Sequence, residues 1–495
     1  MKARITLDAL GAGARELLQA LDEMLGAGRP AWLVGGAVRD ALSGATVRDL
    51  DVAVPSGAIG LARELADRLG AAYFVLDEKR GAARLTGGGC HAWHGPQVDV
   101  AEFRAPDLEG DLRGRDFTVN ALAVPANQLA RSGEAAVEDP TGGLHDLGTR
   151  LVRLCSPRSL DDDPVRVLRA ARLAMGPGWT LGPGIEEAAT RAAPGLSGVS
   201  AERVRDELLG IFGERASAQG LRLLDGWSVL AVVLPERNAM KETAQSEPHR
   251  FDVWEHSLRA VEGADLLGGR ASELEPWGDS FAAHLAEVLG DGATRREALK
   301  LAALLHDIAK PETRTVEDGR TRFLGHDVRG AERVGEIAAR WRLSGRLASV
   351  LERLVRHHLR PMHLAMADEV TRRARYRFFR DLGDEALDVL LLALADAAAL
   401  RGDSPASIWE GEGGRVVRGL MAGHAEEARA MAAPPLLDGR EVMTALGLEP
   451  GPELGKLLAL LREAQAVGAV STREAAVAYL RRLRSGNLDT PGAVP

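Results

Sequence analysis

The sequence has few of the features that mark secreted or membrane-spanning proteins. Its 495 residues include only two cysteines, Cys90 and Cys155, which are too few for a disulfide framework and lack the spacing of metal ligands. The longest apolar run, 387–400, is interrupted by Asp388 and Asp396 and is too short to span a bilayer. The N-terminus has no apolar segment of the signal-peptide kind. We therefore expect a cytoplasmic protein with no membrane partner.

An excess of positive charge is also missing, since the formal net charge is −9. Proteins that coat nucleic acid are normally basic, so broad, non-specific RNA binding is disfavoured. Local basic stretches remain compatible with RNA contact, although a solvated helix face is the simpler interpretation. The densest of these stretches contains Arg372, Arg373, Arg375, Arg377 and Arg380.

The hydrophobic pattern changes along the chain, and the length allows about three domains. Apolar spacing predicts helices over 7–27 and 59–69, and alternation predicts strands at 31–34, 47–54, 73–76, 83–85 and 97–103. A small mixed sheet with helices on one face fits the first 150 residues. From Asp163 onward the pattern is almost wholly helical, with Pro- and Gly-rich breaks at 175–184, 193–198 and 235–248. The predicted fold class is therefore α+β.

Two carboxylates stand two positions apart in the second predicted strand, in Arg48-Asp49-Leu50-Asp51-Val52. Side chains at i and i+2 of a strand lie on the same face, so Asp49 and Asp51 point the same way. Asp99 lies in a later strand with the same alternation. Oxygen ligands of this kind suit Mg²⁺, and three acids on adjacent strands can hold two ions that promote phosphoryl transfer.

A glycine pair, Gly35-Gly36, follows the first predicted strand and opens a helix that continues through Arg39 and Asp40. Glycine lets the backbone approach a phosphate closely, and a helix N-terminus offers N–H groups and partial positive charge. The same pair is also common in simple turns, so the motif is weak alone.

Together these motifs resemble the head of the class II tRNA nucleotidyltransferase and bacterial poly(A) polymerase family. Four further blocks of that family follow in its order: 111–122, similar to "RRDFTxNAL"; 139–147, similar to "DPxGGxxDL"; 162–170, similar to "EDPxRxLRA"; and 200–208, similar to "SxERxxxEL". Five ordered blocks over about 175 residues make coincidence an inadequate explanation.

The resemblance implies the roles of particular residues. Asp49 and Asp51 would be ligands of Mg²⁺ in the head, and Asp99 would be the third catalytic carboxylate. Asp163 and Arg166, expected at i and i+3 on one helical face, would read the base of the incoming nucleotide in place of a template. The remaining nucleotide-binding residues implied are Gly35, Gly36, Arg39, Arg115, Asp116, Asn120 and Arg169.

Three departures from the family pattern bear on activity. Gly114 stands where the family usually has the first Arg of "RRD", and Asp162 replaces the usual Glu. Only six residues, 105–110, separate Arg104 from Asp111, whereas many family members carry a longer loop there that helps to select ATP. The short segment favours an enzyme that adds CC.

A second constellation covers roughly 250–400. A lone buried histidine is usually a satisfied core group, but the order H…HD…H…H…D on successive helices resembles the HD metal-dependent phosphohydrolase superfamily. The resemblance makes His256, His306, Asp307 and Asp396 ligands of a first metal. His326 and either His357 or His358 would complete a second site, and Lys310 would contact a phosphate. The metal would be Mg²⁺, Mn²⁺ or a transition metal that activates water.

These resemblances divide the chain into a nucleotidyltransferase head (1–150), a helical neck (151–248), an HD domain (249–405) and a helical C-terminal region (406–495). The leading hypothesis is a tRNA 3′-end nucleotidyltransferase that adds C, as CC or CCA, from CTP with or without ATP. Its HD domain would hydrolyse phosphate esters at RNA ends. We expect tRNA as partner and no obligate protein partner. The alternatives are a bacterial poly(A) polymerase and an HD phosphohydrolase whose head only binds RNA.

Overall fold

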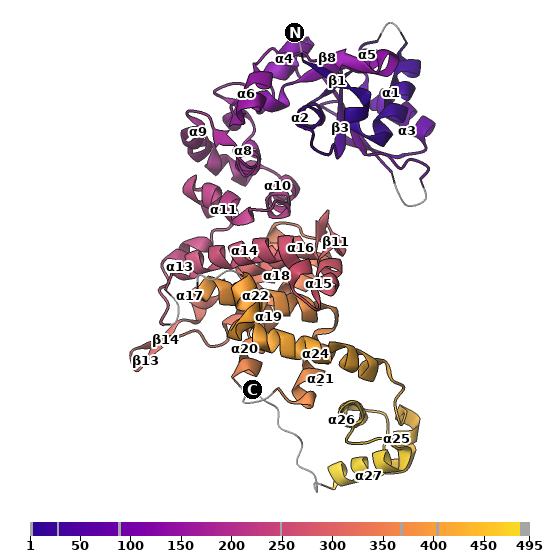
Figure 1. Cartoon of the computed structure of the whole chain (residues 1–495), viewed down its shortest axis with the longest axis vertical. Coiled ribbons are helices and arrows are strands. Elements are labelled where there is room, and N and C mark those ends of the chain that lie inside the picture. Colours follow the sequence, from indigo (N-terminus) through magenta and orange to yellow (C-terminus); the bar gives the residue numbers. More distant parts are fainter. Residues whose placement is uncertain are drawn as a thin grey trace. The chain divides into compact units, whose positions relative to one another are not determined.

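The computed structural model describes residues 3–26, 29–87, 91–247, 250–366, 370–401 and 405–485. The chain divides into two compact units, the first formed by 1–207 with 220–233 and the second by 208–219 with 234–495. Each unit is described by itself, and Figure 1 shows the order of their elements. The predicted α+β class is confirmed, because the large sheet lies in the first unit and the second is helical apart from two short hairpins. Among the described residues, no helix combines the length and apolarity needed to cross a membrane.

The first unit contains a six-stranded mixed sheet with strand order β4-β5-β6-β3-β2-β7. The pair β3 and β6 is parallel, and the other pairs are antiparallel. The five predicted strands are present, and β7 is an addition that the sequence did not reveal. The strands are β2 (Trp32–Val34), β3 (Asp49–Val54), β4 (Ala72–Asp77), β5 (Ala82–Thr86), β6 (Gln97–Glu102) and β7 (Ala123–Pro125).

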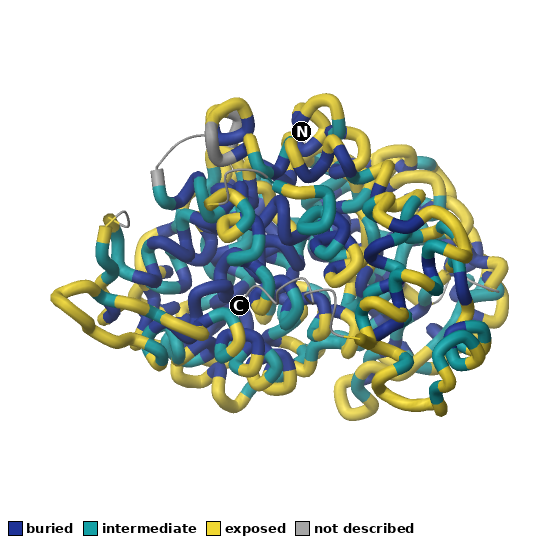
Figure 2. The backbone as a smooth tube through the Cα atoms, turned by 90° about the horizontal axis from the view of Figure 1, so that it is seen from below, coloured by how far each residue is buried: buried dark blue, intermediate teal, exposed yellow. Residues whose placement is uncertain are grey.

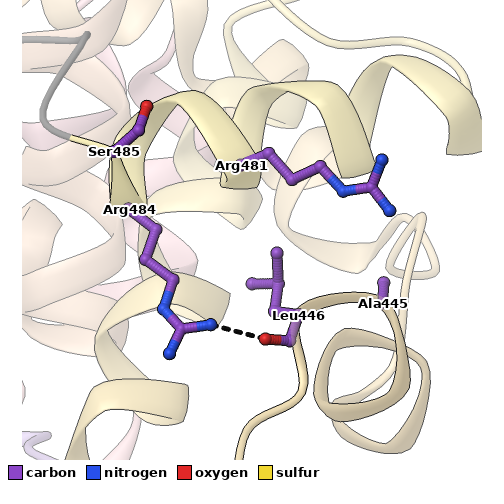
Figure 3. Close-up of a pocket in the computed structure, with 5 residues that line it drawn as sticks. All are labelled: Ala445, Leu446, Arg481, Arg484 and Ser485. Carbon is purple, nitrogen blue, oxygen red and sulfur yellow. Dashed lines mark hydrogen bonds between the residues drawn. The ribbon is translucent and has the colours of Figure 1, made fainter.

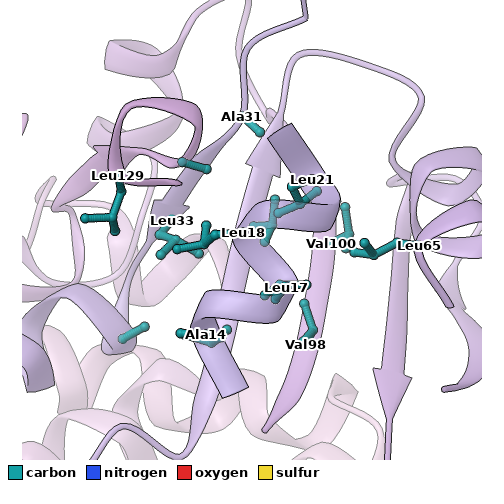
Figure 4. Packing of buried hydrophobic residues seen from close by; sticks show 14 of the residues in the cluster. Ala14, Leu17, Leu18, Leu21, Ala31, Leu33, Leu65, Val98, Val100 and Leu129 are labelled. Atoms are coloured by element: carbon teal, nitrogen blue, oxygen red, sulfur yellow. The ribbon is translucent and has the colours of Figure 1, made fainter. Parts of the chain in front are cut away.

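Helices of the first 150 residues bury one face of this sheet. Leu17 and Leu18 of α1 pack with Leu33 of β2 and with Val98 and Val100 of β6, as Figure 4 shows. The expected helix 7–27 is in fact a 3₁₀ turn (Leu7–Leu10) followed by α1, because Gly11 between them has φ 87°. The helices are α1 (Ala12–Leu25), α2 (Gly36–Ser43), α3 (Ala58–Leu69), α4 (Leu108–Arg113), α5 (Ala126–Ser132) and α6 (Gly143–Thr149).

The opposite face of the sheet is only partly covered. There Leu112 of α4 packs with Val34 and Ala53 in a small cluster. The expectation of helices on one face alone therefore needs correcting. The uncovered part of this face carries polar side chains.

Short helices follow in the neck, as predicted, but Asp163 is not helical. It precedes Pro164, whose ring disfavours the helical conformation of the residue before it, and its backbone is extended (φ −150°, ψ 93°). The expectation that Asp163 and Arg166 share a helical face is therefore wrong. The helices are α7 (Ser159–Asp162), α8 (Arg166–Ala174), α9 (Ile185–Ala192), α10 (Ala201–Gly213), α11 (Ser217–Gly226), α12 (Val229–Val233) and α13 (Arg237–Lys241).

In the second unit, α14 packs against α16 and α22, and α18 packs against α19. Figure 2 shows how buried and exposed positions are distributed along the backbone. Two hairpins, β11–β12 (Val288–Gly290, Ala293–Thr294) and β13–β14 (Thr315–Glu317, Arg320–Arg322), were not predicted. The helices up to 401 are α14 (Val253–Arg270), α15 (Gly278–Leu285), α16 (Arg295–Leu305), α17 (Lys310–Thr313), α18 (His326–Arg340), α19 (Gly345–His357), α20 (Arg360–Ala365), α21 (Arg372–Leu382) and α22 (Ala386–Arg401).

The arginine run of α21 does not form a solvated face. Arg377 donates to Glu463 of α26 at 2.8 and 2.9 Å, and Arg375 donates to Glu427 of α24 at 3.0 Å. Both acceptor side chains are buried, so the arginines hold the C-terminal helices together. These helices are α23 (Pro405–Glu410), α24 (Glu412–Ala432), α25 (Gly439–Leu446), α26 (Pro452–Ala466) and α27 (Arg473–Arg484).

A surface hollow lies between α25 and α27, as Figure 3 shows. Arg484 donates to the carbonyl of Leu446 across it at 2.5 Å. The lining residues are Ala445, Leu446, Arg481, Arg484 and Ser485. The hollow contains none of the residues that the sequence assigned to chemistry.

Leu17→Ala tests the packing of α1 on the sheet. Leu17 is fully buried, so truncation should destabilise the first unit by about 2–5 kcal/mol. The measurement is the midpoint of unfolding in urea, followed by circular dichroism. Leu76→Ala on β4 is the matched control, because Leu76 is 47% exposed and should change the midpoint little. Equal shifts for the two variants would contradict the described core.

Candidate functional site

The three predicted carboxylates meet on the open face of the sheet. Parallel pairing of β3 with β6 sets Asp51 directly beside Asp99, with Asp49 one pleat away on the same face. Leu50 and Val52 point into the core on the other side. The strand alternation predicted from the sequence therefore separates a dry face from an acidic one.

An arginine that the sequence analysis missed completes this row. Arg84 of β5 lies opposite Asp99 on the neighbouring strand, and its Nε and Nη2 donate to the two carboxylate oxygens at 2.7 and 2.8 Å. Such a bidentate pair fixes the orientation of the carboxylate. No motif marks Arg84, because its position follows from the order of strands in the sheet.

The carboxylates destabilise one another. Burial raises the pKa of Asp51 to about 6, and the charges of Asp99 and Asp49 act in the same direction. Burial and the charge of Asp99 also raise the pKa of Asp49. A bound cation would relieve this repulsion, since an opposite charge nearby favours the ionised form of a carboxyl group. The donor set therefore fits a hard divalent metal such as Mg²⁺.

Gly35 stands against the acidic row and has φ 75°. A Cβ atom there would lie 3.0 Å from Oδ2 of Asp51 and 3.2 Å from Nη1 of Arg115. Both the positive φ and the close approach favour glycine. Arg115 is held in turn by the buried Asp111, to which its Nη2 donates at 3.1 Å. Gly36, the first residue of α2, follows directly.

The other predicted nucleotide-binding side chains form a polar network. Arg39 donates to Oδ1 of Asn120 at 2.7 Å, and Asn120 donates to Asp116 at 3.2 Å. Arg169 donates to Asp116 at 2.8 Å and to Glu207, also at 2.8 Å. Although burial opposes ionisation, Arg169 lowers the pKa of Asp116 to about 2. Glu207 lies in the block 200–208, but no role was predicted for it from the sequence.

The two predicted base-reading residues come together despite the extended conformation of Asp163. Nε of Arg166 lies 3.9 Å from Oδ2 of Asp163. Asp163 also accepts from Arg203 at 2.7 Å. A carboxylate and a guanidinium thus stand side by side, one able to accept from a base edge and the other to donate to it.

The second unit gathers histidines and aspartates from five helices or their ends. These residues form two groups, and the ligand atoms within each group lie within 4.8 Å of one another. His256, His306 and Asp396 form the first group, and Asp307, His326 and His358 form the second. The residues come from α14, the end of α16, the start of α18, the end of α19 and the middle of α22. The family resemblance assigned Asp307 to the first metal, whereas in the structure it groups with His326 and His358.

Backbone contacts orient three of the imidazoles. Nδ1 of His306, His326 and His358 faces the carbonyl three residues earlier, at 2.9, 2.7 and 2.6 Å respectively. Donation from Nδ1 leaves the Nε2 lone pair pointing into the cluster, the tautomer that binds metals. Nε2 of His326 and Nε2 of His358 lie only 3.3 Å apart. Two facing lone pairs are compatible with a cation between them.

Asp307 joins the two groups. Its Oδ2 lies 3.1 Å from Nε2 of His306, and its Oδ1 lies 3.3 Å from Nε2 of His326. Although burial opposes ionisation, His306 and Lys310 hold the pKa of Asp307 well below its ordinary value. Lys310 Nζ is 2.7 Å from Oδ2 of Asp307 and donates to Gln245 at 2.7 Å. Gln245 was not identified from the sequence.

The structure distinguishes the adjacent pair His357 and His358. His358 is buried in the second group, where desolvation lowers its pKa to about 4, so the ring is neutral as a metal ligand must be. His357 is the last residue of α19, is partly exposed and belongs to neither group. Of the two residues that the sequence left open, His358 has the geometry of a ligand.

Three family models match successive parts of the chain. The poly A polymerase head domain matches residues 31–153, a probable RNA- and SrmB-binding site of polymerase A matches 178–241, and the HD domain matches 253–400. The acidic face lies in the first match, and the histidine cluster lies in the third.

Whole-chain similarity agrees with these matches. An A-adding tRNA nucleotidyltransferase of Deinococcus radiodurans is 38% identical over 93% of this chain and 96% of its own length. A CC-adding tRNA nucleotidyltransferase of Thermus thermophilus is 36% identical over 92% and 94%. The fold is similar to that of a CCA-adding enzyme in its apo form, with 21% identity, a TM-score of 0.61 and coverage of 97% and 95%. It is also similar to that of the Thermotoga maritima CCA-adding enzyme complexed with tRNA, with 20% identity, a TM-score of 0.57 and coverage of 98% and 100%.

The acidic face, the ordered blocks and the similarity over nearly the whole length point to one conclusion. The chain belongs to the tRNA nucleotidyltransferase family.

Proposed function

We propose that the protein extends the 3′ end of tRNA by nucleotides taken from CTP, with or without ATP. The observation that carries the proposal is the row of Asp49, Asp51 and Asp99 on adjacent parallel strands. Relatives whose names describe tRNA nucleotidyltransferases support tRNA as the partner. No obligate protein partner is needed for this chemistry.

Asp49, Asp51 and Asp99 would act on the reacting groups. The 3′ oxygen of the RNA attacks the α-phosphorus of the nucleotide, and pyrophosphate leaves. Mg²⁺ held by Asp49 and Asp51 would supply charge stabilisation for both oxygens. Asp99, oriented by Arg84, would face the attacking hydroxyl.

The remaining side chains would select and hold the nucleotide. Gly35 and Gly36 at the start of α2 and Arg115 would approach the triphosphate, while the network of Arg39, Asp116, Asn120 and Arg169 would shape the ribose side. Asp163 and Arg166 would read the base. A carboxylate accepts from an exocyclic amine and a guanidinium donates to a ring nitrogen or carbonyl, a pattern that fits C and A.

The segment 105–110 supports CC addition. It is short and ordered, because Asp107 caps α4 by accepting from the backbone N–H of Gly110 at 2.8 Å. A-addition is the second candidate, favoured by the similarity to the A-adding enzyme of D. radiodurans. Both candidates use the same acidic row and differ only in the nucleotide accepted.

The second unit would act as a phosphohydrolase on RNA ends. Its histidine and aspartate groups fit two divalent ions, Mg²⁺, Mn²⁺ or a transition metal, which would supply an activated water. Lys310 would contact the phosphate. The proposed domains are the head (1–150), neck (151–248), HD domain (249–405) and C-terminal region (406–495).

Nucleotide addition to staged substrates tests the main proposal. The substrates are tRNA ending before CC, at CC and at CCA, together with an unrelated RNA, each with CTP or ATP alone. CC addition predicts extension of the first substrate by CTP and no reaction elsewhere. Extension of the first by CTP together with extension of the second by ATP would indicate CCA addition. Extension of the second by ATP without extension of the first by CTP would indicate A addition. Long A tracts on the unrelated RNA would indicate a poly(A) polymerase and contradict the tRNA proposal.

Asp51→Asn tests the acidic row. Loss of several kcal/mol of charge stabilisation should reduce the rate of nucleotide addition roughly a thousandfold. Asp67→Asn, on the exposed side of α3, is the control and should leave the rate unchanged. Hydrolysis of p-nitrophenyl phosphate should be unaffected by either substitution. If Asp51→Asn retained full addition, the head would not be the nucleotidyltransferase.

His357→Ala and His358→Ala form a matched pair that tests the HD cluster. His358→Ala removes a buried ligand and should lower the bound metal by about one equivalent per chain. His357→Ala should keep the wild-type content, because this side chain lies outside both groups. Metal content is measured by inductively coupled plasma mass spectrometry after gel filtration in Mn²⁺. Equal metal content in the two variants, or loss from His357→Ala alone, would refute the assignment.

A further inference from the structure

The guanidinium of Arg166 is buried and held by fixed acceptors. Its Nη1 donates to Oγ of Ser159 at 2.9 Å and to the carbonyls of Ser159 at 3.2 Å and Arg115 at 3.4 Å. Its Nη2 donates to the carbonyl of Gly114 at 3.3 Å. Arg166 as a whole residue is only 7% exposed. The backbone of the head and the start of α7 thus form a cradle around one end of this side chain.

One edge of the Arg166 guanidinium is left outside the cradle. A guanidinium has five N–H donors in a rigid plane. The contacts above engage the end formed by Nη1 and Nη2. The other edge is formed by Nε and the second N–H of Nη2, and among the described residues it faces Oδ2 of Asp163, 3.9 Å from Nε. This edge, adjacent to Asp163, is the one that can face a base.

Ser159 is the one side chain in the cradle. It is 2% exposed, and its hydroxyl donates toward the carbonyls of Asp116 at 3.0 Å and Arg115 at 3.3 Å. Both acceptors belong to consecutive residues of the head, so the hydroxyl hydrogen points toward this segment and a lone pair is left for Nη1 of Arg166. The contact at 2.9 Å is the shortest that Arg166 makes.

We propose that Ser159 is a specificity-determining positioning residue, which holds Arg166 so that its Nε/Nη2 edge is presented to the incoming base. The proposal rests on the proposed role of Asp163 and Arg166 in base reading. Without the hydroxyl, Arg166 retains the carbonyl contacts of 3.2 to 3.4 Å and the more distant Asp163 at 3.9 Å. Its plane can then rotate, and bases with other donor patterns become acceptable.

The test uses Ser159→Ala, Ser159→Thr and Arg166→Ala, with tRNA ending before CC and each of the four nucleoside triphosphates separately. Hydrogen bonds to charged groups correspond to roughly tenfold effects or more. Ser159→Ala should therefore raise KM for CTP about tenfold and reduce discrimination against UTP by a similar factor, with little change in kcat. Ser159→Thr retains the hydroxyl and should restore discrimination.

Ser217→Ala is the matched control, since Ser217 is also a fully buried serine but belongs to the second unit. It should leave discrimination unchanged. Thermal unfolding of each variant checks the fold, and the double variant Ser159→Ala/Arg166→Ala should discriminate no worse than Arg166→Ala alone.

Two results would overturn the proposal. One is unchanged discrimination in Ser159→Ala while Arg166→Ala loses it, which leaves base reading intact and removes Ser159 from it. The other is an equal fall in kcat for all four nucleotides, which indicates a merely structural role. Full discrimination in Arg166→Ala would instead refute base reading by Arg166 itself, a failure of the proposed function that is distinguishable from the other two.

Discussion

The parallel pairing of β3 with β6 is the constraint on which the first unit depends. It places Asp51 beside Asp99 with Asp49 on the same face, and like charges at this separation oppose ionisation. Positively charged side chains lie beside these carboxylates and offset part of their repulsion. Arg84 takes both oxygens of Asp99, and Arg115 lies near Asp51. The remaining charge is what makes the face suited to a divalent ion.

Several arginines that could contact a nucleic acid or a nucleotide are engaged within the protein. Arg169 is held between Asp116 and Glu207, and the run on α21 contacts buried glutamates of α24 and α26. This use of arginine is consistent with an overall charge of −9. Charge alone therefore identifies no RNA surface, and recognition of the nucleotide depends on a few oriented groups.

The histidine cluster also has its ligand groups oriented by the protein, here through imidazoles instead of carboxylates alone. Backbone carbonyls three residues upstream orient the imidazoles, and Asp307 faces both ligand groups. The sites in the two units are built from separate elements, one mainly from strands and one from helices and helix ends. In each site the protein balances part of the buried charge, and a bound cation would balance the rest.

Much of this protein could be predicted from its sequence. Alternation through Leu50 and Val52 was sufficient to place Asp49 and Asp51 on one face, because strand geometry has a period of two. The α+β class and five of the six strands of the sheet followed from hydrophobic periodicity. The candidate residues came from ordered blocks, and their roles remain proposals.

Only the tertiary structure decided which residues meet across the chain. Arg84 became a partner of Asp99 through the order of strands, and Ser159 became a partner of Arg166 through the turn between α7 and α8. It separated His358 from His357, since adjacent residues at a helix end point in different directions. It also removed Asp163 from the helix, although Pro164 was visible in the sequence. Periodicity describes which face of an element a residue occupies, whereas these outcomes depend on strand order, on turns between elements and on how each side chain leaves a helix end.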